Sequence, residues 1–176
     1  FSIVDFNDKA DVYLFNTCAV TEIAERECRQ LVRKALRINP EAFIIVTGCY
    51  AQLRPEEISA IEGVDVVLGS NEKFEIFSLL QDFDKKELSC VYVSPKDELN
   101  SFGLASSTDA DSRTRAYFKI QDGCDYFCSY CTVPLARGGS RNPCIAEIKS
   151  EAEKIVAAGV REIVLTGVNV GDFGKS

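Results

Sequence analysis

Apolar residues recur with two different periods along the first half of the chain, and the alternation between them predicts the order of its elements. Short apolar runs at residues 11–16 (DVYLFN), 43–47 (FIIVT) and 64–68 (VDVVL) are typical of strands. The middle run has no polar residue before Thr47, which indicates a strand covered on both faces. The chain therefore alternates buried strands with longer segments of a different period.

Those longer segments have the spacing of helices. Apolar positions recur every three or four residues over 22–38, and Asn39-Pro40 then stops the helix. A short helix over 55–61 starts at a proline, and a third, capped by Asn71, is expected to run to about residue 83. Alternating strands and helices imply an α/β fold with a parallel sheet of the flavodoxin-like kind.

The remaining sequence predicts an incomplete second unit. Residues 84–115 are rich in Ser, Asp and Lys and are expected to form a linker, with a possible edge strand at 88–93. From residue 116 the pattern is a strand at 117–120, a cysteine-rich loop, a helix over 143–158 and a strand at 162–166. We therefore expect a first domain over 1–83, a connection over 84–115 and one βαβ unit over 116–176, which is too short to complete a barrel.

Composition narrows the class of protein. The chain has 176 residues, a net charge of −7, no apolar run of membrane-spanning length, and no signal peptide at its start, so a cytoplasmic location is expected. The charge argues against a large basic nucleic-acid surface within these residues. The absence of methionine predicts that the natural N-terminus lies upstream of Phe1.

Cysteine chemistry dominates the second unit. The chain has eight Cys and no His, which excludes mixed Cys/His zinc sites, and a cytosolic α/β context favours metal binding or catalysis over disulfides. Cys124, Cys128 and Cys131 have C-x3-C-x2-C spacing directly after a strand. Three such thiolates can hold three corners of a [4Fe–4S] cluster and leave the fourth iron open to an outside ligand.

Two simpler readings of this loop stay open. Cys144 could join the three thiols in a structural zinc site, although such sites usually pair two C-x2-C motifs. The thiols could also be clustered by chance. In the same way, Arg137 and Arg141 beyond the loop could be ordinary surface charges.

Two further thiols follow predicted strands of the first domain. Cys18 comes after the first strand in NTC, and Cys49 after the second in TGCYAQ. Carboxyl ends of parallel strands share one edge of a sheet, where ligands of open α/β sheets bind, so these thiols are expected to be neighbours. The alternative is that both are structural cysteines of the core.

The stretch RAYFKIQDGCDYFCSYCTVPLARGGSR resembles the radical S-adenosylmethionine (SAM) superfamily, and within it the methylthiotransferase family. The resemblance rests on the cysteine spacing, the aromatic Tyr130 before the third cysteine, the entry motif at Lys119–Gln121 and the exit residues Pro134, Arg137 and Gly138. It implies that Cys124, Cys128 and Cys131 hold the SAM-binding [4Fe–4S] cluster. It also implies that Tyr130 lies near the adenine of SAM.

The resemblance also covers the first domain. In the family, three cysteines of this domain hold a second, auxiliary [4Fe–4S] cluster that supplies or carries sulfur, and Cys18 and Cys49 match two of them. The third is expected upstream, in a GC-x2-N motif that this sequence lacks. Cys28 could substitute in principle, but its place on an apolar helix face favours the core, and Cys90 and Cys144 match no family motif.

The segment LTGVNVGDFG resembles the branch of the family that methylthiolates C2 of N6-threonylcarbamoyladenosine at position 37 of tRNA. Gly167 would let the backbone approach the cofactor and Asn169 could hydrogen-bond it, although both also suit an ordinary turn. The implied partners are tRNA, in the full-length protein, and an electron donor such as flavodoxin, with no membrane. Complete members carry more barrel strands and an RNA-binding TRAM domain.

Other functions stay open at this point. The substrate could instead be isopentenyl-adenosine or a ribosomal protein, as in other branches of the family. A different radical SAM enzyme with a flavodoxin-like or cobalamin-binding domain is another possibility, disfavoured by the lack of a histidine ligand. The non-enzymatic alternative is a zinc-stabilised α/β binding module.

Overall fold

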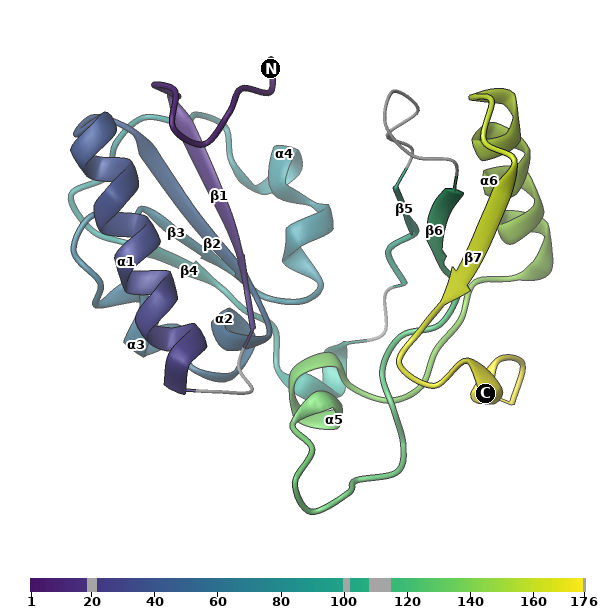
Figure 1. Ribbon diagram of the computed structural model, residues 1–176. Helices are drawn as coiled ribbons and strands as arrows, with labels where there is room; N and C mark the ends of the chain where they lie inside the picture. The colour runs from purple at the N-terminus through teal and green to yellow at the C-terminus, as the bar shows by residue number, and fades with distance from the viewer. Residues whose placement is uncertain (19–21, 100–101, 108–114, 176) are drawn as a thin grey trace. The chain divides into compact units, whose positions relative to one another are not determined.

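A computed structural model describes residues 1–18, 22–99, 102–107 and 115–175 of the chain. It divides into two compact units, Phe1–Leu99 and Asn100–Ser176, and each is described by itself (Figure 1). Neither unit contains a helix that is long and apolar enough to cross a membrane, as far as the described residues go.

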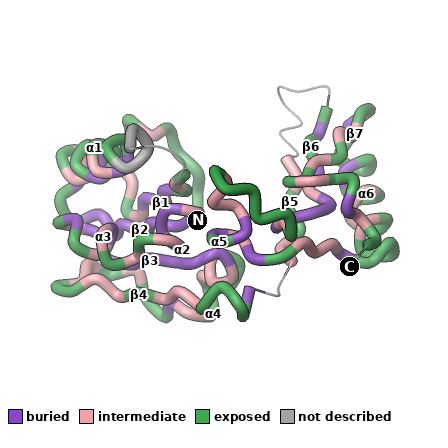
Figure 2. Tube along the Cα trace, turned by 90° about the horizontal axis from the view of Figure 1, so that it is seen from below, coloured by how far each residue is buried: buried purple, intermediate pink, exposed green. Residues whose placement is uncertain are grey.

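Unit 1 is built on a four-stranded parallel sheet, as the sequence predicts. Its strands are β1 (Val12–Thr17), β2 (Phe43–Gly48), β3 (Val66–Leu68) and β4 (Cys90–Tyr92), and they lie side by side in that order. Every residue of β2 and β3 is buried (Figure 2), because both strands have a neighbour on each side and helices on each face. The prediction of a strand covered on both faces is confirmed.

Helices cover both faces of this sheet. On one face lie α1 (Glu22–Ile38), α2 (Cys49–Leu53) and α3 (Pro55–Ser59). On the other lie a 3-10 turn η1 (Glu72–Phe74) and the short helix α4 (Ile76–Leu79). Two separate apolar clusters result, one around Val32 and Ile44 under α1 and one around Phe43 and Leu80 under α4. The α/β fold class predicted from the sequence is confirmed.

The helix predicted from Asn71 to about residue 83 is wrong in length. Asn71 makes no side-chain cap; its amide Nδ2 instead donates to the carbonyl oxygen of Glu98 at 2.8 Å. The Glu72 carboxylate accepts the backbone N–H of Ser94 at 2.9 Å. These bonds hold the first turn against the segment after β4, so a 3-10 turn forms there and only one turn of α-helix follows.

The first unit also extends further than residue 83. Asp65, almost completely buried, accepts the backbone N–H of Ile44 at 2.7 Å and that of Lys86 at 2.7 Å, and it pairs with Lys85 Nζ at 2.8 Å. These contacts hold the chain after α4 against the sheet, and β4 then pairs with β3. Residues 84–99 are therefore part of unit 1, with a short 3-10 turn η2 (Lys96–Glu98) near its end.

Unit 2 contains the expected βαβ arrangement. Strands β6 (Arg115–Lys119) and β7 (Glu162–Thr166) pair in parallel, and α6 (Ile145–Ala157) lies between them in the sequence. Phe118 and Ile155 form the centre of its core. The strand β5 (Ala105–Ser106), within the predicted linker, was not expected, and it pairs antiparallel with β6.

Candidate cluster-binding loop and thiol edge

The cysteine loop leaves the sheet of unit 2 at the carboxyl end of β6. Lys119, the last residue of β6, is in register with Thr166 of β7, and the Ile120 N–H donates to the Thr166 carbonyl at 2.9 Å. The chain then runs through the loop into the short helix α5 (Val133–Arg137). The loop therefore starts where parallel strands of α/β proteins present their ligand-binding residues.

Backbone hydrogen bonds close the neck of this loop. Asp122 and Arg141 form an antiparallel bridge with bonds of 3.0 and 2.9 Å, and the Cys124 N–H donates to the Gly138 carbonyl at 3.1 Å. Gly123 has a φ of +72°, and a Cβ there would lie 1.9 Å from the Gly139 carbonyl oxygen. The two sides of the neck thus approach more closely than any side chain at residue 123 would permit.

A cluster of charges surrounds the same neck. The Asp122 carboxylate is only 6% exposed, and three cations lie around it: Lys119 Nζ at 3.2 Å, Arg137 Nη1 at 3.4 Å and Arg141 Nη2 at 3.6 Å. The side chain of Arg141 is itself largely buried. Arg141 is therefore not an ordinary surface charge, and both arginines help to join the start of the loop to its end.

These charges lead to a prediction for the pH dependence of unit 2. Burial raises the pKa of Asp122, but the three cations and the Gly123 N–H outweigh it and hold that pKa below its ordinary value. The ionised carboxylate therefore adds stability that is complete above pH ~4 and is lost as the pH falls through the lower folded pKa. Thermal unfolding of the wild type and Asp122→Asn should differ at neutral pH and converge in acid. A difference that grows toward low pH would contradict this.

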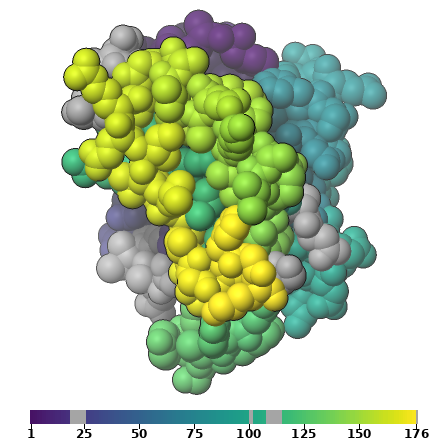
Figure 3. Space-filling model, turned by 90° about the vertical axis from the view of Figure 1, so that its right-hand side faces the viewer, coloured from purple at the N-terminus to yellow at the C-terminus, as the bar shows by residue number. Residues whose placement is uncertain are grey.

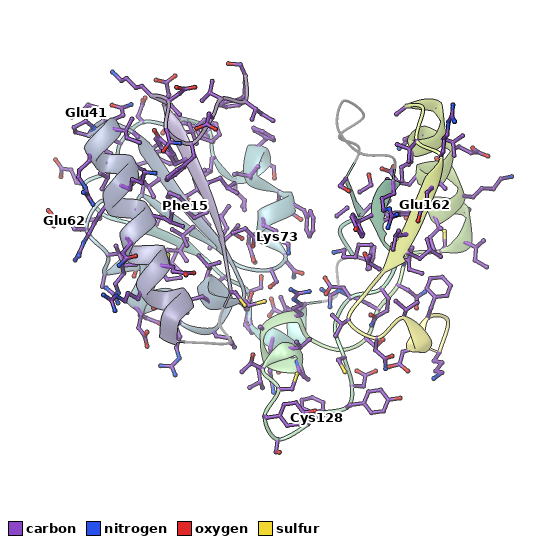
Figure 4. The ribbon with its side chains drawn as sticks, in the orientation of Figure 1. Phe15, Glu41, Glu62, Lys73, Cys128 and Glu162 are labelled. Carbon is purple, nitrogen blue, oxygen red and sulfur yellow. The ribbon has the colours of Figure 1, made fainter. Side chains whose placement is uncertain are left out.

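The three thiols of the loop are reduced and accessible, but they are not gathered around one point. Cys128 is exposed and lies at the outer end of the loop (Figure 4), whereas Cys124 and Cys131 are half-buried. The Cys131 N–H donates to the Cys128 carbonyl at 2.9 Å, which makes a tight turn between them. Within the described residues, no three Cys, Asp or Glu side chains lie within metal-binding reach of one another.

The tip of the loop nevertheless carries the chemistry of a cluster site on an exposed segment. Residues 125–130 are all exposed, so they contribute nothing to the core. Phe127 has a φ of +39°, a conformation that costs energy for a bulky residue. The donor set is three thiols within eight residues, which is the chemistry that iron–sulfur clusters require. The residues therefore fit a cluster chemically.

The residues expected to contact SAM have different surroundings. Tyr130 is 87% exposed on the loop tip. At Gly167, an added Cβ would lie 2.9 Å from the Gln121 side chain, so a protein contact already requires a small residue there. The Asn169 side chain donates to Asp172 Oδ2 at 2.8 Å within a 3-10 turn, η3 (Val170–Asp172). Their predicted roles toward SAM stay predictions.

Cys18 and Cys49 follow two residues that are paired across the sheet of unit 1. Thr17 of β1 is in register with Gly48 of β2, so each thiol comes directly after its strand at the same edge. Gly48 has a φ of +104°, and a Cβ there would lie 2.2 Å from the Thr17 carbonyl oxygen. The sheet thus brings the two cysteines to neighbouring positions, as the strand pattern predicted.

The other three cysteines are part of the structure around them. Cys28, a residue of α1, is 2% exposed and packs in the core between this helix and the sheet, which confirms that it is a core residue. Cys90 lies in β4. Cys144 is the N-cap of α6: its side chain accepts a backbone N–H of the first turn, and its own N–H donates to Glu147 at 2.8 Å. This capping role argues against Cys144 as a fourth zinc ligand.

The motif at Lys119–Gln121 marks the entry to the loop, but it predicts no role for the side chain of Gln121 or for Asp122. Both are buried polar side chains directly before the first cysteine of the loop. The sequence contains one indication of their role. Both are polar residues at the end of an apolar strand, where the pattern predicts burial, and buried polar side chains need hydrogen-bond partners. Both belong to the framework that holds the loop.

Comparisons with known proteins extend over nearly the whole chain. Residues 1–69 match the profile of a family described as Uncharacterized protein family UPF0004. The threonylcarbamoyladenosine tRNA methylthiotransferase MtaB of Bacillus subtilis is 40% identical over 171 residues, which are 97% of this chain and 38% of that protein. Proteins of the same name from four other bacteria are 34–40% identical.

Relatives with other names also match. The ribosomal protein uS12 methylthiotransferase RimO of Chloroflexus aurantiacus is 31% identical over 96% of the chain and 40% of its own length. The tRNA-2-methylthio-N(6)-dimethylallyladenosine synthase of Clostridium novyi is 34% identical over 99% of the chain and 40% of its own length. The chain therefore spans about two-fifths of the length of the curated relatives it matches.

Proposed function

Because the chain is related to the methylthiotransferases over nearly its whole length, we propose that it is part of a radical SAM methylthiotransferase. The observation that carries this proposal is the C-x3-C-x2-C loop at the carboxyl end of β6, held by its closed neck, in a chain 40% identical to a methylthiotransferase of Bacillus subtilis. The cysteine spacing and the sequence similarity support the same function.

In this proposal Cys124, Cys128 and Cys131 are the ligands of one [4Fe–4S] cluster. The closed neck fixes Cys124 relative to β6, and the turn between Cys128 and Cys131 keeps the other two thiols close in sequence and in backbone position. When bound, the cluster supplies an open iron for SAM and the electron that cleaves it. Tyr130, on the exposed tip of this loop, would be the aromatic residue next to the bound SAM.

Cys18 and Cys49 are proposed as ligands of the auxiliary cluster. Their support is the register pair Thr17–Gly48, which brings two thiols to one edge of a parallel sheet. A third thiolate would come from outside the 176 residues. The alternative that both are core cysteines is disfavoured for Cys18, because its side chain is exposed.

The proposed substrate is N6-threonylcarbamoyladenosine in tRNA, methylthiolated at C2. It is supported by five relatives named threonylcarbamoyladenosine tRNA methylthiotransferase at 34–40% identity, against 31% and 34% for those named for a ribosomal protein and for dimethylallyladenosine. The enzymes named for these other substrates belong to the same family, so methylthiolation of either substrate is the competing outcome of the test. The protein would also need a one-electron donor such as flavodoxin.

Analysis of tRNA nucleosides tests the substrate. The full-length protein would be expressed in a bacterial strain that lacks all three methylthiotransferase activities, and its tRNA would be digested and analysed by mass spectrometry. We expect the 2-methylthio derivative of N6-threonylcarbamoyladenosine, which should be absent with a Cys124→Ala variant. Methylthiolation of dimethylallyladenosine or of protein uS12 alone would contradict the assignment.

A further inference from the structure

Gln121 lies where three segments of unit 2 meet, and its side chain is completely buried. A buried primary amide has two donors and one acceptor that must all be satisfied, because an unpaired polar group in a core is costly. The partners of this amide therefore show which parts of the chain it holds together.

The amide nitrogen of Gln121 bonds to both ends of the cysteine loop. Nε2 lies 3.1 Å from the Asp122 carbonyl and 2.9 Å from the Gly123 carbonyl, at the start of the loop. It also lies 3.0 Å from Ser140 Oγ, beyond the far end. These contacts join the two strands of the neck through one side chain.

The amide oxygen bonds to the turn that follows β7. Oε1 accepts the backbone N–H of Asn169 at 2.8 Å. Gly167 makes this approach possible, because a Cβ there would lie 2.9 Å from the Gln121 Cβ and Oε1. Gln121 thus connects the cysteine loop to the end of the neighbouring parallel strand.

The same turn has a second contact with the loop, nearer its tip. Asp172 in η3 accepts the Asn169 side chain at 2.8 Å on Oδ2 and the Tyr126 hydroxyl at 3.3 Å on Oδ1. In Figure 3 the end of the chain (yellow) lies at the surface, and Asp172 and Lys175 there border a small pocket together with Asp125, Tyr126 and Ser140. The turn after β7 therefore holds the loop at its base through Gln121 and near its tip through Tyr126.

We propose that Gln121 is a positioning residue that ties the cysteine loop to the turn after β7, so that the position of this turn sets the position of the loop thiols. The inference deepens the proposed function, on which its meaning for SAM binding rests. Gly167, in this view, is required by its contact with Gln121. A substitution at Gly167 should therefore destabilise the cysteine loop.

A matched pair of glycine substitutions tests the tie. Gly167→Ala would push Gln121 away, whereas Gly171→Ala adds the same methyl group in the same turn, with its nearest neighbour the Asn169 Oδ1 at 3.4 Å. In the cluster-free full-length protein, hydrogen exchange of the amides over residues 122–131 should rise about tenfold with Gly167→Ala, the factor expected for one lost buried hydrogen bond. Gly171→Ala should leave it unchanged.

A second readout links the tie to SAM. In the reconstituted protein, Gly167→Ala should weaken SAM binding about tenfold and alter the electron paramagnetic resonance signal of the reduced cluster, and Gly171→Ala should do neither. Ser140→Ala, which removes one partner of Gln121, should act in the same direction to a smaller extent and serves if Gly167→Ala does not fold.

The outcomes separate the two proposals. Equal exchange and equal SAM binding in the Gly167 and Gly171 variants would overturn the positioning role while leaving the proposed function intact. A wild-type protein that takes up no cluster would overturn the proposed function, and the exchange comparison would still decide whether Gln121 ties the loop to the turn.

Discussion

Replacing Gly123 by alanine is expected to open the neck of the cysteine loop and abolish SAM binding. The new Cβ would lie 1.9 Å from the Gly139 carbonyl oxygen and 2.8 Å from that of Gly138, and both are backbone atoms. The strand ends must therefore separate, which breaks the bond from Cys124 to Gly138. The steric clash and the positive φ each cost about 1–3 kcal/mol, so unit 2 should lose several kcal/mol of stability.

Gly159→Ala is the matched control. Gly159 has a φ of +88°, but no atom lies within 4 Å of an added Cβ, so this variant incurs the conformational cost without the clash. Thermal unfolding and SAM titration of both reconstituted variants measure the difference. If Gly123→Ala bound SAM as tightly as Gly159→Ala, the closed neck would not be needed to hold the thiols.

Gly48→Ala is expected to remove the auxiliary cluster and spare the other one. The added Cβ would lie 2.2 Å from the Thr17 carbonyl oxygen and 2.7 Å from its nitrogen, at the last register pair of β1 and β2. The strand ends must move apart, and Cys18 and Cys49 move with them. About half of the iron of a protein with two clusters should be lost on reconstitution, with SAM binding retained.

Gly63→Ala provides the comparison within unit 1. Gly63 also has a positive φ, of +88°, but its added methyl would meet only side-chain atoms of Leu36, which can turn away. Iron content and SAM affinity of the two variants would be measured side by side. Full iron content in Gly48→Ala would show that the edge at Thr17 and Gly48 does not hold the auxiliary cluster.

The regular elements could be predicted from the sequence because their own residues determine them. The apolar run of β2 and the helical spacing of α1 correspond to the observed elements, and α1 has the predicted bounds. The segment from Asn71 to about residue 83, predicted as one helix, could not be predicted in the same way. Its first residues bond to Ser94 and Glu98, far along the chain, and Phe74 and Phe77 are exposed instead of packing on the sheet.

The candidate site shows the same division. The thiols could be identified from spacing, since C-x3-C-x2-C is visible in the sequence itself. Gln121 could not, because its partners at Ser140 and Asn169 become neighbours only when β6 and β7 pair. The same holds for Gly167. The sequence suggested a contact with the cofactor, whereas in the structure the side chain that lies against it is that of Gln121.

The metal content of the anaerobically purified, reconstituted full-length protein tests most directly whether Cys124, Cys128 and Cys131 hold a SAM-binding cluster. We expect about eight irons with matching sulfide in the wild type, and about four irons with no SAM binding when Cys124, Cys128 and Cys131 are all replaced by alanine. Undiminished iron and SAM binding in the triple variant, or a single zinc without sulfide in the wild type, would contradict the assignment of these three thiols to the SAM-binding cluster.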